Sequence, residues 1–299
     1  MNVGFVSLRE QATYFALLEL PSYGEVRVEK LIAEFNSAID VWSSISANID
    51  SGKIEHFAAR VYEIEAEILQ FTARGIRCVS IYEREYPENL RHSRFLKRYL
   101  FGYGNLAIST AVSVAVIGTS SADATGLRNV DNIVVDAVGR GYVIISGLAR
   151  GIDAAAHRAA LRAGGFTVAV VGTGLGTVYP PENRDLLIEL TKTGAAFSKY
   201  LPTFKGARWS FPERNKVMAG MACATIVMES KLGSGSLLQA KSALSDRQPV
   251  FIHRSNLELP ENFGWIDELM KRGAILFSSF DEVHTELQNS RLKTEEYLF

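Results

Sequence analysis

The sequence SGLARGIDAAAHRAAL, at residues 146–161, joins an apolar run to a segment with helical spacing, and this order constrains the fold. It follows an apolar run at residues 142–145, breaks at Gly147 and continues as an alanine-rich segment. That segment has Asp153 and His157 four residues apart, which places both on one face of a helix. An apolar strand, a glycine turn and a helix in this order are typical of a sheet in which strands and helices alternate.

The same alternation repeats along most of the chain. Further apolar runs rich in β-branched residues occur at residues 112–117, 167–171, 224–228, 249–252 and 274–277. Segments with helical periodicity lie between them, near residues 126–140, 151–164, 182–193, 213–223, 236–246 and 264–272. Strands with continuous apolar runs are buried on both faces of a sheet. The pattern predicts an α/β fold with a doubly wound, mostly parallel sheet over residues 76–280.

Residues 1–75 are expected to form a small helical domain. The amphipathic segments 14–20 and 26–35 are separated by the turn PSYG, as in a helix-hairpin-helix or SAM-like domain. Such a hairpin can contact a DNA backbone or can serve only for packing. Glu19 and Glu25 flank the turn and would repel phosphate, which favours the packing role.

Composition excludes several classes of protein. The 299 residues are 47% hydrophobic with a net charge of −1, so any affinity for nucleic acid must come from local clusters of Lys and Arg. Cys78 and Cys223 belong to no CxxC or Cys/His motif, which predicts neither a disulfide framework nor a metal site. Residues 1–25 lack a signal-peptide pattern, and no apolar run approaches the ~20 residues of a membrane span. We expect a soluble, cytoplasmic protein with no membrane partner.

Glycine, serine and threonine follow four of the predicted strands. The loops are IGTSS at 117–121, ISGL at 145–148, VGTGLGT at 171–177 and GSGS at 233–236. Glycines permit close backbone approach, and helix N-termini favour anions. Because the carboxyl ends of parallel strands share one edge, the loops predict a phosphate-binding edge. GxGxxG and GxxxxGK[ST] motifs are missing, as is an acid placed to hold a ribose, so NAD and ATP are disfavoured and no cofactor is expected.

A second signal lies between residues 199 and 216. This segment holds one acid, Glu213, and five cations: Lys199, Lys205, Arg208, Arg214 and Lys216. Its aromatic residues are Tyr200, Phe204, Trp209 and Phe211. Cations neutralise phosphates and aromatic rings stack on unpaired bases, at ~1–3 kcal/mol per base. The combination favours binding of a single strand over a duplex.

Four motifs, in this order and spacing, resemble the DprA/Smf family of DNA-processing proteins. They are SGLARGIDAAAHRAAL, VAVVGTGLGTVYPPEN at 168–183, FPERNKVMAG at 211–220 and SGSLLQAKSAL at 234–244. The resemblance covers about residues 86–277, and residues 12–40 resemble the small N-terminal helical domain common in that family. It implies a Rossmann-like core that binds single-stranded DNA without sequence preference, forms a homodimer and acts with RecA in recombination or natural transformation. No reaction is established for the family, so the resemblance implies that the chain is not an enzyme.

The resemblance also implies which residues bind DNA. The loops after the first three core strands contribute Gly118, Thr119, Ser120, Gly147, Arg150, Gly151, Gly172, Thr173, Gly174, Tyr179, Pro180 and Asn183. Later motifs contribute Phe211, Arg214, Asn215, Lys216, Ser234, Gly235 and Ser236. The basic cluster adds Lys199, Lys205 and Arg208.

This chain departs from the family pattern at several positions. Ser120 replaces a usual Arg, Lys199 a usual acid, Gln239 a usual Thr, and His253 with Arg254 a usual VPG. The changes suggest that the binding surface has shifted toward Lys199, His253 and Arg254. The residues after 280 are expected to form a tail, too short for the winged helix that many members carry.

Two alternatives remain open. Phosphoribohydrolases share the Rossmann-like core, but their PGGxGTxxE motif corresponds here to GSGSLLQA, which lacks the acid. A sensor of a small nucleotide could use the same edge without DNA. The spacing of Asp153 and His157 also permits a hydrogen-bonded pair, for which we expect a structural role rather than catalysis.

Overall fold

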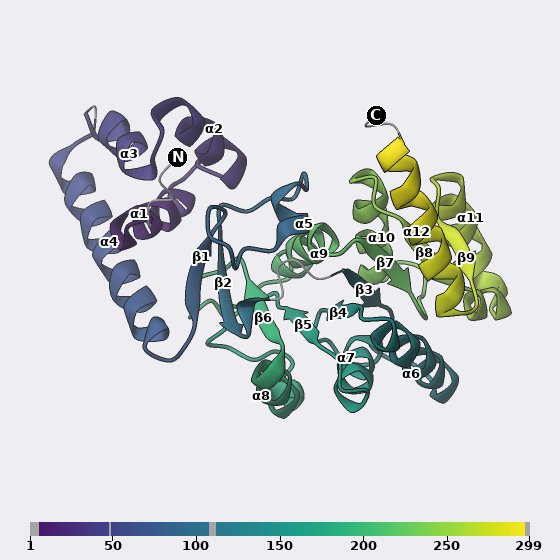
Figure 1. Cartoon of the computed structure of the whole chain (residues 1–299). Helices are drawn as coiled ribbons and strands as arrows, with labels where there is room; N and C mark the ends of the chain where they lie inside the picture. Colours follow the sequence, from purple (N-terminus) through teal and green to yellow (C-terminus); the bar gives the residue numbers. More distant parts are fainter. Residues whose placement is uncertain (1–5, 48, 108–111, 297–299) are drawn as a thin grey trace.

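The computed structural model describes residues 6–47, 49–107 and 112–296, and its centre is a single sheet (Figure 1). The strands are β1 (Arg77–Ser80), β2 (Tyr99–Gly104), β3 (Ser113–Ile117), β4 (Val143–Ser146), β5 (Thr167–Val170), β6 (Ala195–Ser198), β7 (Ala224–Val227), β8 (Val250–His253) and β9 (Ile275–Phe277). Across the sheet they lie in the order β1-β2-β6-β5-β4-β3-β7-β8-β9.

The strands from β6 to β9 in this order run parallel, whereas β2 pairs antiparallel with both β1 and β6. From β3 the chain moves outward to β6, and it then returns to β7 on the other side of β3. Side chains of β3 enter two apolar layers, Ile117 on one face and Val116 on the other. These features confirm the predicted Rossmann-like, doubly wound sheet and place its switch point at the carboxyl ends of β3 and β7.

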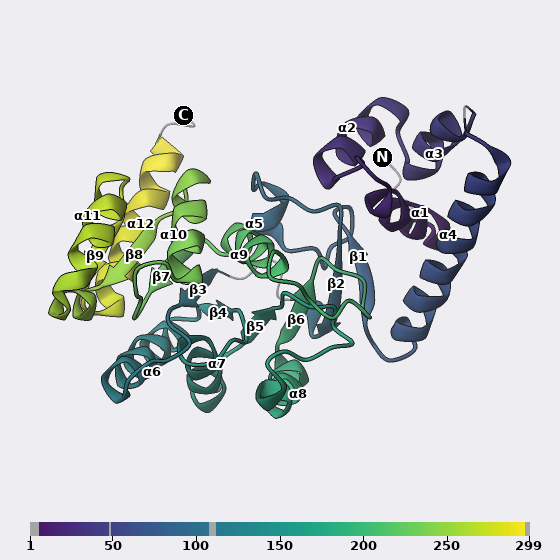
Figure 2. The ribbon, with the colours of Figure 1, turned by 180° about the vertical axis from the view of Figure 1, so that it is seen from behind.

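Helices cover both faces of the sheet. In the core they are α5 (Glu88–Arg91), α6 (Ala124–Gly139), α7 (Ile152–Arg162), α8 (Arg184–Thr193), α9 (Ser210–Met221), α10 (Gly235–Ser245), α11 (Phe263–Lys271) and α12 (Phe280–Glu296). Figures 1 and 2 show α6, α7 and α8 on one side of the sheet and α9 and α10 on the other. Buried residues of α12 join the apolar layer of α6 and α7, while those of α11 join the layer of α9 and α10.

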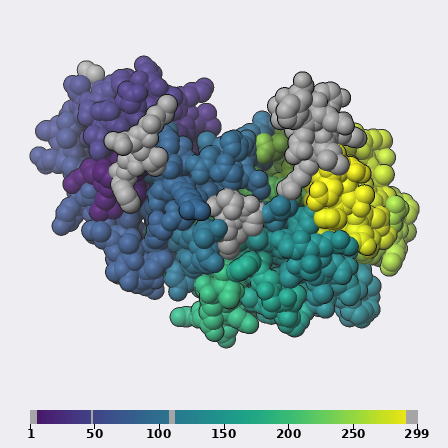
Figure 3. All heavy atoms as spheres, viewed as in Figure 1, coloured from purple at the N-terminus to yellow at the C-terminus, as the bar shows by residue number. Residues whose placement is uncertain are grey.

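The N-terminal helices form a bundle that packs on the β1–β2 end of the sheet. They are α1 (Leu8–Glu19), α2 (Glu25–Phe35), α3 (Ala38–Ser46) and α4 (Ser51–Thr72). The Phe15 ring lies 5.3 Å from that of Phe101, and Tyr14 lies 5.0 Å from Tyr99. The Glu25 carboxylate accepts from Lys97 at 2.9 Å. Figure 3 shows the resulting contact between the helical domain and the blue part of the core.

The α1–α2 hairpin contacts the protein itself. Glu19 pairs with Arg60 of α4, and Glu25 pairs with Lys97 next to β2. Both acids beside the turn therefore serve the packing of the domain.

In the core, strands β1, β2 and β6 and helices α5 and α12 lie outside the predicted runs. β1 and β2 form an antiparallel pair within residues 76–107, and β6 has the short sequence AAFS, whose small residues give a weak strand signal. The residues expected to form a tail after 280 continue helix α12. Phe280, Val283 and Leu287 of this helix are buried against α6 and α7, although the helix is otherwise polar.

Within the described residues, no helix combines the length and apolar character needed to span a bilayer.

Candidate nucleic-acid interface

The turn between β4 and α7 requires glycine. Gly151 has a φ of +66°, and a Cβ there would collide with the backbone carbonyl of Thr119 in the loop after β3. The Ile152 amide donates to that same carbonyl at 3.1 Å. The first two loops at the carboxyl edge are therefore locked against each other.

Arg214 lies buried beneath these loops. Its Nη1 donates to the carbonyl oxygens of Gly147 and, at 2.7 Å, Val170, which joins the ends of β4 and β5. A Cβ at Gly147 would occupy the space of this guanidinium. Burial raises the pKa of the Asp153 carboxyl, while the nearby Arg214 acts in the opposite direction. Arg214 thus supports the edge from below instead of presenting its charge to solvent.

The Asp153–His157 pair allowed by the sequence spacing does not form. Thr167 Oγ1 donates to the Ile144 carbonyl at 2.9 Å, so at 2.6 Å it accepts from Nδ1–H of His157. Asp153 instead accepts from the Ala149 amide at 3.3 Å. Burial lowers the pKa of His157 to about 3, which keeps the imidazole neutral. The two side chains have separate structural roles.

The loop after β5 is held by its own polar residues. Asn183 is buried, and its Nδ2 donates to the carbonyls of Leu148 at 2.9 Å and Ala149 at 3.2 Å. Thr173 is also buried and donates to the Thr177 carbonyl at 2.8 Å. These contacts tie the second loop to the third.

Glycine allows the third loop to approach its neighbours closely. A Cβ at Gly172 would meet the Phe211 ring at 2.7 Å, and one at Gly174 would collide with the backbone at residues 201–202.

Arg150, expected to face a phosphate, is exposed and paired with Glu182.

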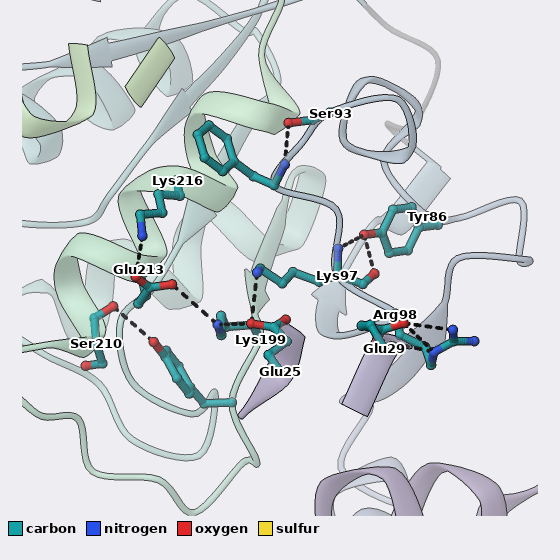
Figure 4. Close-up of polar contacts among 12 residues, drawn as sticks. Glu25, Glu29, Tyr86, Ser93, Lys97, Arg98, Lys199, Ser210, Glu213 and Lys216 are labelled. Atoms are coloured by element: carbon teal, nitrogen blue, oxygen red, sulfur yellow. Dashed lines mark hydrogen bonds and ion pairs between the residues drawn. The ribbon is translucent and has the colours of Figure 1, made fainter. Parts of the chain in front are cut away.

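Two lysines of the basic cluster are already paired with acids (Figure 4). Lys199 donates to Glu25 of α2 at 2.9 Å, and Lys216 donates to Glu213 at 2.6 Å. Although burial raises the pKa of Glu25, the ammonium groups of Lys199 and Lys97 lower it overall. The helical domain therefore neutralises a cation that the sequence assigned to DNA binding.

The other cations and several rings are exposed on one rim. We define the rim as Tyr179, Lys205, Arg208, Trp209 and Phe211, on the loops after β5 and β6 and the start of α9. Lys205 and Arg208 are exposed and form no ion pair with a described residue. Trp209 is 59% exposed and Tyr179 51%, and the Tyr179 ring lies 5.4 Å from that of the half-buried Phe211. This rim presents both positive charge and aromatic faces to solvent.

The switch point itself is occupied by carboxylates. Asp123 caps α6 by accepting from the Gly126 amide at 2.7 Å, and Glu229, after β7, accepts from the Asp123 amide at 3.3 Å. Burial raises the pKa of Glu229. The acids fill the anion-binding end of α6, so this helix does not offer its amides to a phosphate. Sequence reasoning missed Glu229, although its place directly after an apolar run marks the carboxyl edge.

Three hydroxyl groups meet at the start of α10. Ser230, Ser234 and Ser236 lie within 2.7–2.8 Å of one another. Asn215 Nδ2 donates to the Gly235 carbonyl at 3.2 Å, which connects α9 to this loop. Ser230, fully buried, was not predicted, and its position after a strand in a run of serines is the signal that could have identified it.

The residues that depart from the family pattern differ in their exposure to solvent. Ser120 and Arg254 are exposed, whereas Gln239 is buried in α10. His253 is buried, and its Nδ1 accepts from the Ser255 amide at 3.3 Å. Of the residues toward which the surface was expected to shift, Arg254 presents its charge to solvent, while His253 and the paired Lys199 do not.

Glycine-rich loops, exposed rings and exposed cations lie at the carboxyl edge of a Rossmann-like α/β protein, the edge at which ligands bind in this class of fold. Residues 77–288 match the model of the DNA recombination-mediator protein A family. The chain belongs to this family, which confirms the resemblance found in its motifs.

Individual relatives agree with this assignment. DNA processing protein DprA of Bacillus subtilis is 30% identical over 253 residues, which cover 84% of each chain. DprA of Streptococcus pneumoniae is 33% identical over 232 residues, covering 78% of this chain and 82% of the relative. An X-ray structure of the S. pneumoniae protein matches with a TM-score of 0.77 at 28% identity, over 95% of this chain and 99% of that chain.

A more distant structure shares the fold. It is DNA processing protein A of Helicobacter pylori, described for its unique single-stranded DNA binding mode. The TM-score is 0.62 at 24% identity, over 72% of this chain and 96% of that chain.

Proposed function

We propose that this chain binds single-stranded DNA, without sequence preference and without cleaving it, across the rim. The observation that carries the proposal is the exposure of Trp209 and Tyr179 together with that of Lys205 and Arg208, which form no ion pair within the part of the chain that the structure describes. Aromatic stacking tolerates every base, at ~1–3 kcal/mol per base, and cations follow the backbone. The single-stranded DNA binding described for the H. pylori protein supports the same role.

The other predicted site residues divide into two groups in this proposal. Exposed or half-buried residues would contact the DNA backbone beside the rim: Gly118, Ser120, Arg150, Gly151, Asn215, Lys216, Ser234 and Gly235. Buried residues would shape the loops: Thr119, Gly147, Gly172, Thr173, Gly174, Asn183, Arg214 and Ser236. Lys199 would join the surface only if its ion pairs with Glu25 and Glu213 opened.

The proposal includes a role beside a recombinase. The family is described as a recombination mediator, which supports transfer of bound strands to RecA. We further propose that the protein acts as a homodimer, so that two rims serve one strand. We place both the homodimer and the transfer of strands to RecA in the cytoplasm, where the DNA and the recombinase are found.

An enzymatic role is not proposed. Asp153 and His157 are not paired, and Gln239 lies in the segment where phosphoribohydrolases have their acid. Asp123 and Glu229 also disfavour a free mononucleotide phosphate at the switch point.

The test is fluorescence anisotropy with labelled dT oligomers of graded length at low salt. The Lys205→Gln/Arg208→Gln variant should bind more weakly, and its salt slope should fall by about 1.4, since each lost contact to a single strand removes ~0.7. Lys30→Gln/Lys192→Gln is the matched control, because both lysines are exposed and lie outside the rim. Absence of dT binding by the parent protein, together with hydrolysis of a free nucleotide, would refute the proposal.

Light scattering measures the molar mass of the protein in solution and therefore tests the proposed homodimer. RecA filament growth on strands coated with single-strand-binding protein reports transfer, and we expect it to be faster with this protein than without it.

A further inference from the structure

A second basic pocket lies behind the loop that carries Tyr179. It has a volume of about 360 Å³ and opens between the end of α4, the end of β2 and the start of α8. Its wall includes Gly176 and Val178 of the loop after β5. The same loop therefore contributes to the pocket and, through Tyr179, to the rim.

The charged side chains lining this pocket are Arg74 and Arg184. Both are exposed, and neither forms an ion pair with any residue that the structure describes. The Arg74 guanidinium lies 4.7 Å from the centre of the Phe71 ring, which fixes its position. Arg184 is the first residue of α8, which directly continues the 3-10 turn Pro181–Asn183, and its amide donates to the Pro181 carbonyl. Two guanidinium groups thus line the same pocket.

The rest of the pocket is apolar and includes one aromatic ring. Tyr103 is 37% exposed, and a Cβ on Gly75, which has a φ of +85°, would lie 3.3 Å from its ring. Ile76 and Leu187 complete the apolar surface. A planar group could lie on the Tyr103 ring while an attached anion reaches the guanidinium groups.

We propose that this pocket binds one nucleotide of the same single strand, its phosphate between Arg74 and Arg184 and its base against Tyr103. The inference rests on the proposed function and adds a second subsite to it. Continuity favours DNA over an acidic peptide, because Val178 lines the pocket and the next residue, Tyr179, belongs to the rim. A strand leaving the rim needs to cross only this loop to enter the pocket.

The test compares Arg74→Gln/Arg184→Gln with the Lys30→Gln/Lys192→Gln control, which removes the same charge. Short dT oligomers that cover only the rim should bind both variants equally. Longer oligomers should bind the arginine variant about tenfold more weakly, which corresponds to ~1.4 kcal/mol. The salt slope for the long oligomers should also fall by about 1.4.

A second variant tests the base contact. Tyr103→Leu should weaken only the long oligomers, and Tyr103→Phe should restore them because it keeps the ring. Unfolding midpoints of all variants should match the parent protein.

The outcomes separate the two proposals. Equal binding of the arginine variant and the control at every length would overturn the pocket subsite while leaving the rim intact. Failure of the parent protein to bind any oligomer would remove both. The arginine variant could instead bind dT as tightly as the parent protein but lose binding of a polyglutamate probe. That result would assign the pocket to an acidic peptide and overturn the nucleotide subsite.

Discussion

At the residue scale, Arg214 shows how a basic side chain of the family motif can hold the loops together instead of presenting its charge to solvent. Its guanidinium binds the ends of β4 and β5 and faces the buried Asp153. Loss of one member of a buried charged pair leaves the other unpaired, which commonly costs about 3–5 kcal/mol.

We predict that Arg214→Met lowers the free energy of unfolding by about 3 kcal/mol or more. Asp153→Asn combined with Arg214→Met should be less destabilised than the sum of the single changes, because the uncompensated charge is removed. Urea denaturation of the three variants checks this. Unchanged stability with lost dT binding would instead show that Arg214 contacts DNA directly.

His157 provides a prediction about pH. Its folded pKa is about 3, below the unfolded value of about 6.5, so the unfolded chain binds a proton that the folded chain does not. The stabilising contribution is complete above pH 6.5 and is lost as the pH falls from there toward 3. His157→Asn, which keeps a donor to Thr167, should remove this loss. Between pH 6.5 and 5 the parent protein should lose about 1.6 kcal/mol more than the variant, because the unfolded imidazole is already half protonated at pH 6.5 and each further unit is worth at most ~1.4 kcal/mol.

Urea midpoints measured at several pH values give the two slopes. Parallel curves for the parent protein and His157→Asn would contradict a neutral, buried imidazole.

At the element scale, the ion pairs between α2 and the core control how much charge the edge presents. The Glu25 carboxylate pairs with Lys97 and Lys199, both of which are far from Glu25 in the sequence. Release of Lys199 would add a cation next to the rim.

We predict that Glu25→Gln strengthens dT binding at low salt and increases the salt slope by about 0.7, as expected for one added contact to a single strand. Glu29→Gln is the control, because Glu29 pairs with Arg98. Anisotropy titrations at several salt concentrations measure both effects. Unaltered or weaker binding by Glu25→Gln, with the fold intact, would contradict a latent role for Lys199.

The sequence predicted the parallel strands other than β6 because each of them is a continuous apolar run, as in SVAVI at β3. It missed β6, whose two alanines resemble a helix as much as a strand, and α12, whose few apolar residues are widely spaced. The loops at the carboxyl edge could be located, since glycine and serine follow the strands. Which cations are free could not be predicted, because Lys199 meets Glu25 only through the docking of two domains.

At the scale of the whole molecule, a net charge of −1 means that any affinity for DNA must depend on the local arrangement of charged residues. The rim supplies Lys205 and Arg208, and the second pocket supplies Arg74 and Arg184. The rim lies at the carboxyl edge, whereas the second pocket extends from the loop after β5 along α8 to the end of β2, beside the start of β6.

We predict that binding of a long dT oligomer weakens with salt at a slope of about −3, because four phosphate contacts contribute ~0.7 each. A plot of log affinity against log salt concentration measures it. A slope near zero would show that stacking alone holds the strand and would contradict the roles of these cations.

The most direct measurement is photo-crosslinking of a dT oligomer that carries 5-iodouracil, followed by mass spectrometry of the linked peptides. If a single strand lies across the rim, crosslinks will form at Tyr179, Trp209 and Phe211. Crosslinks confined to the α1–α2 turn or to α11 and α12, with none on these three rings, would contradict it.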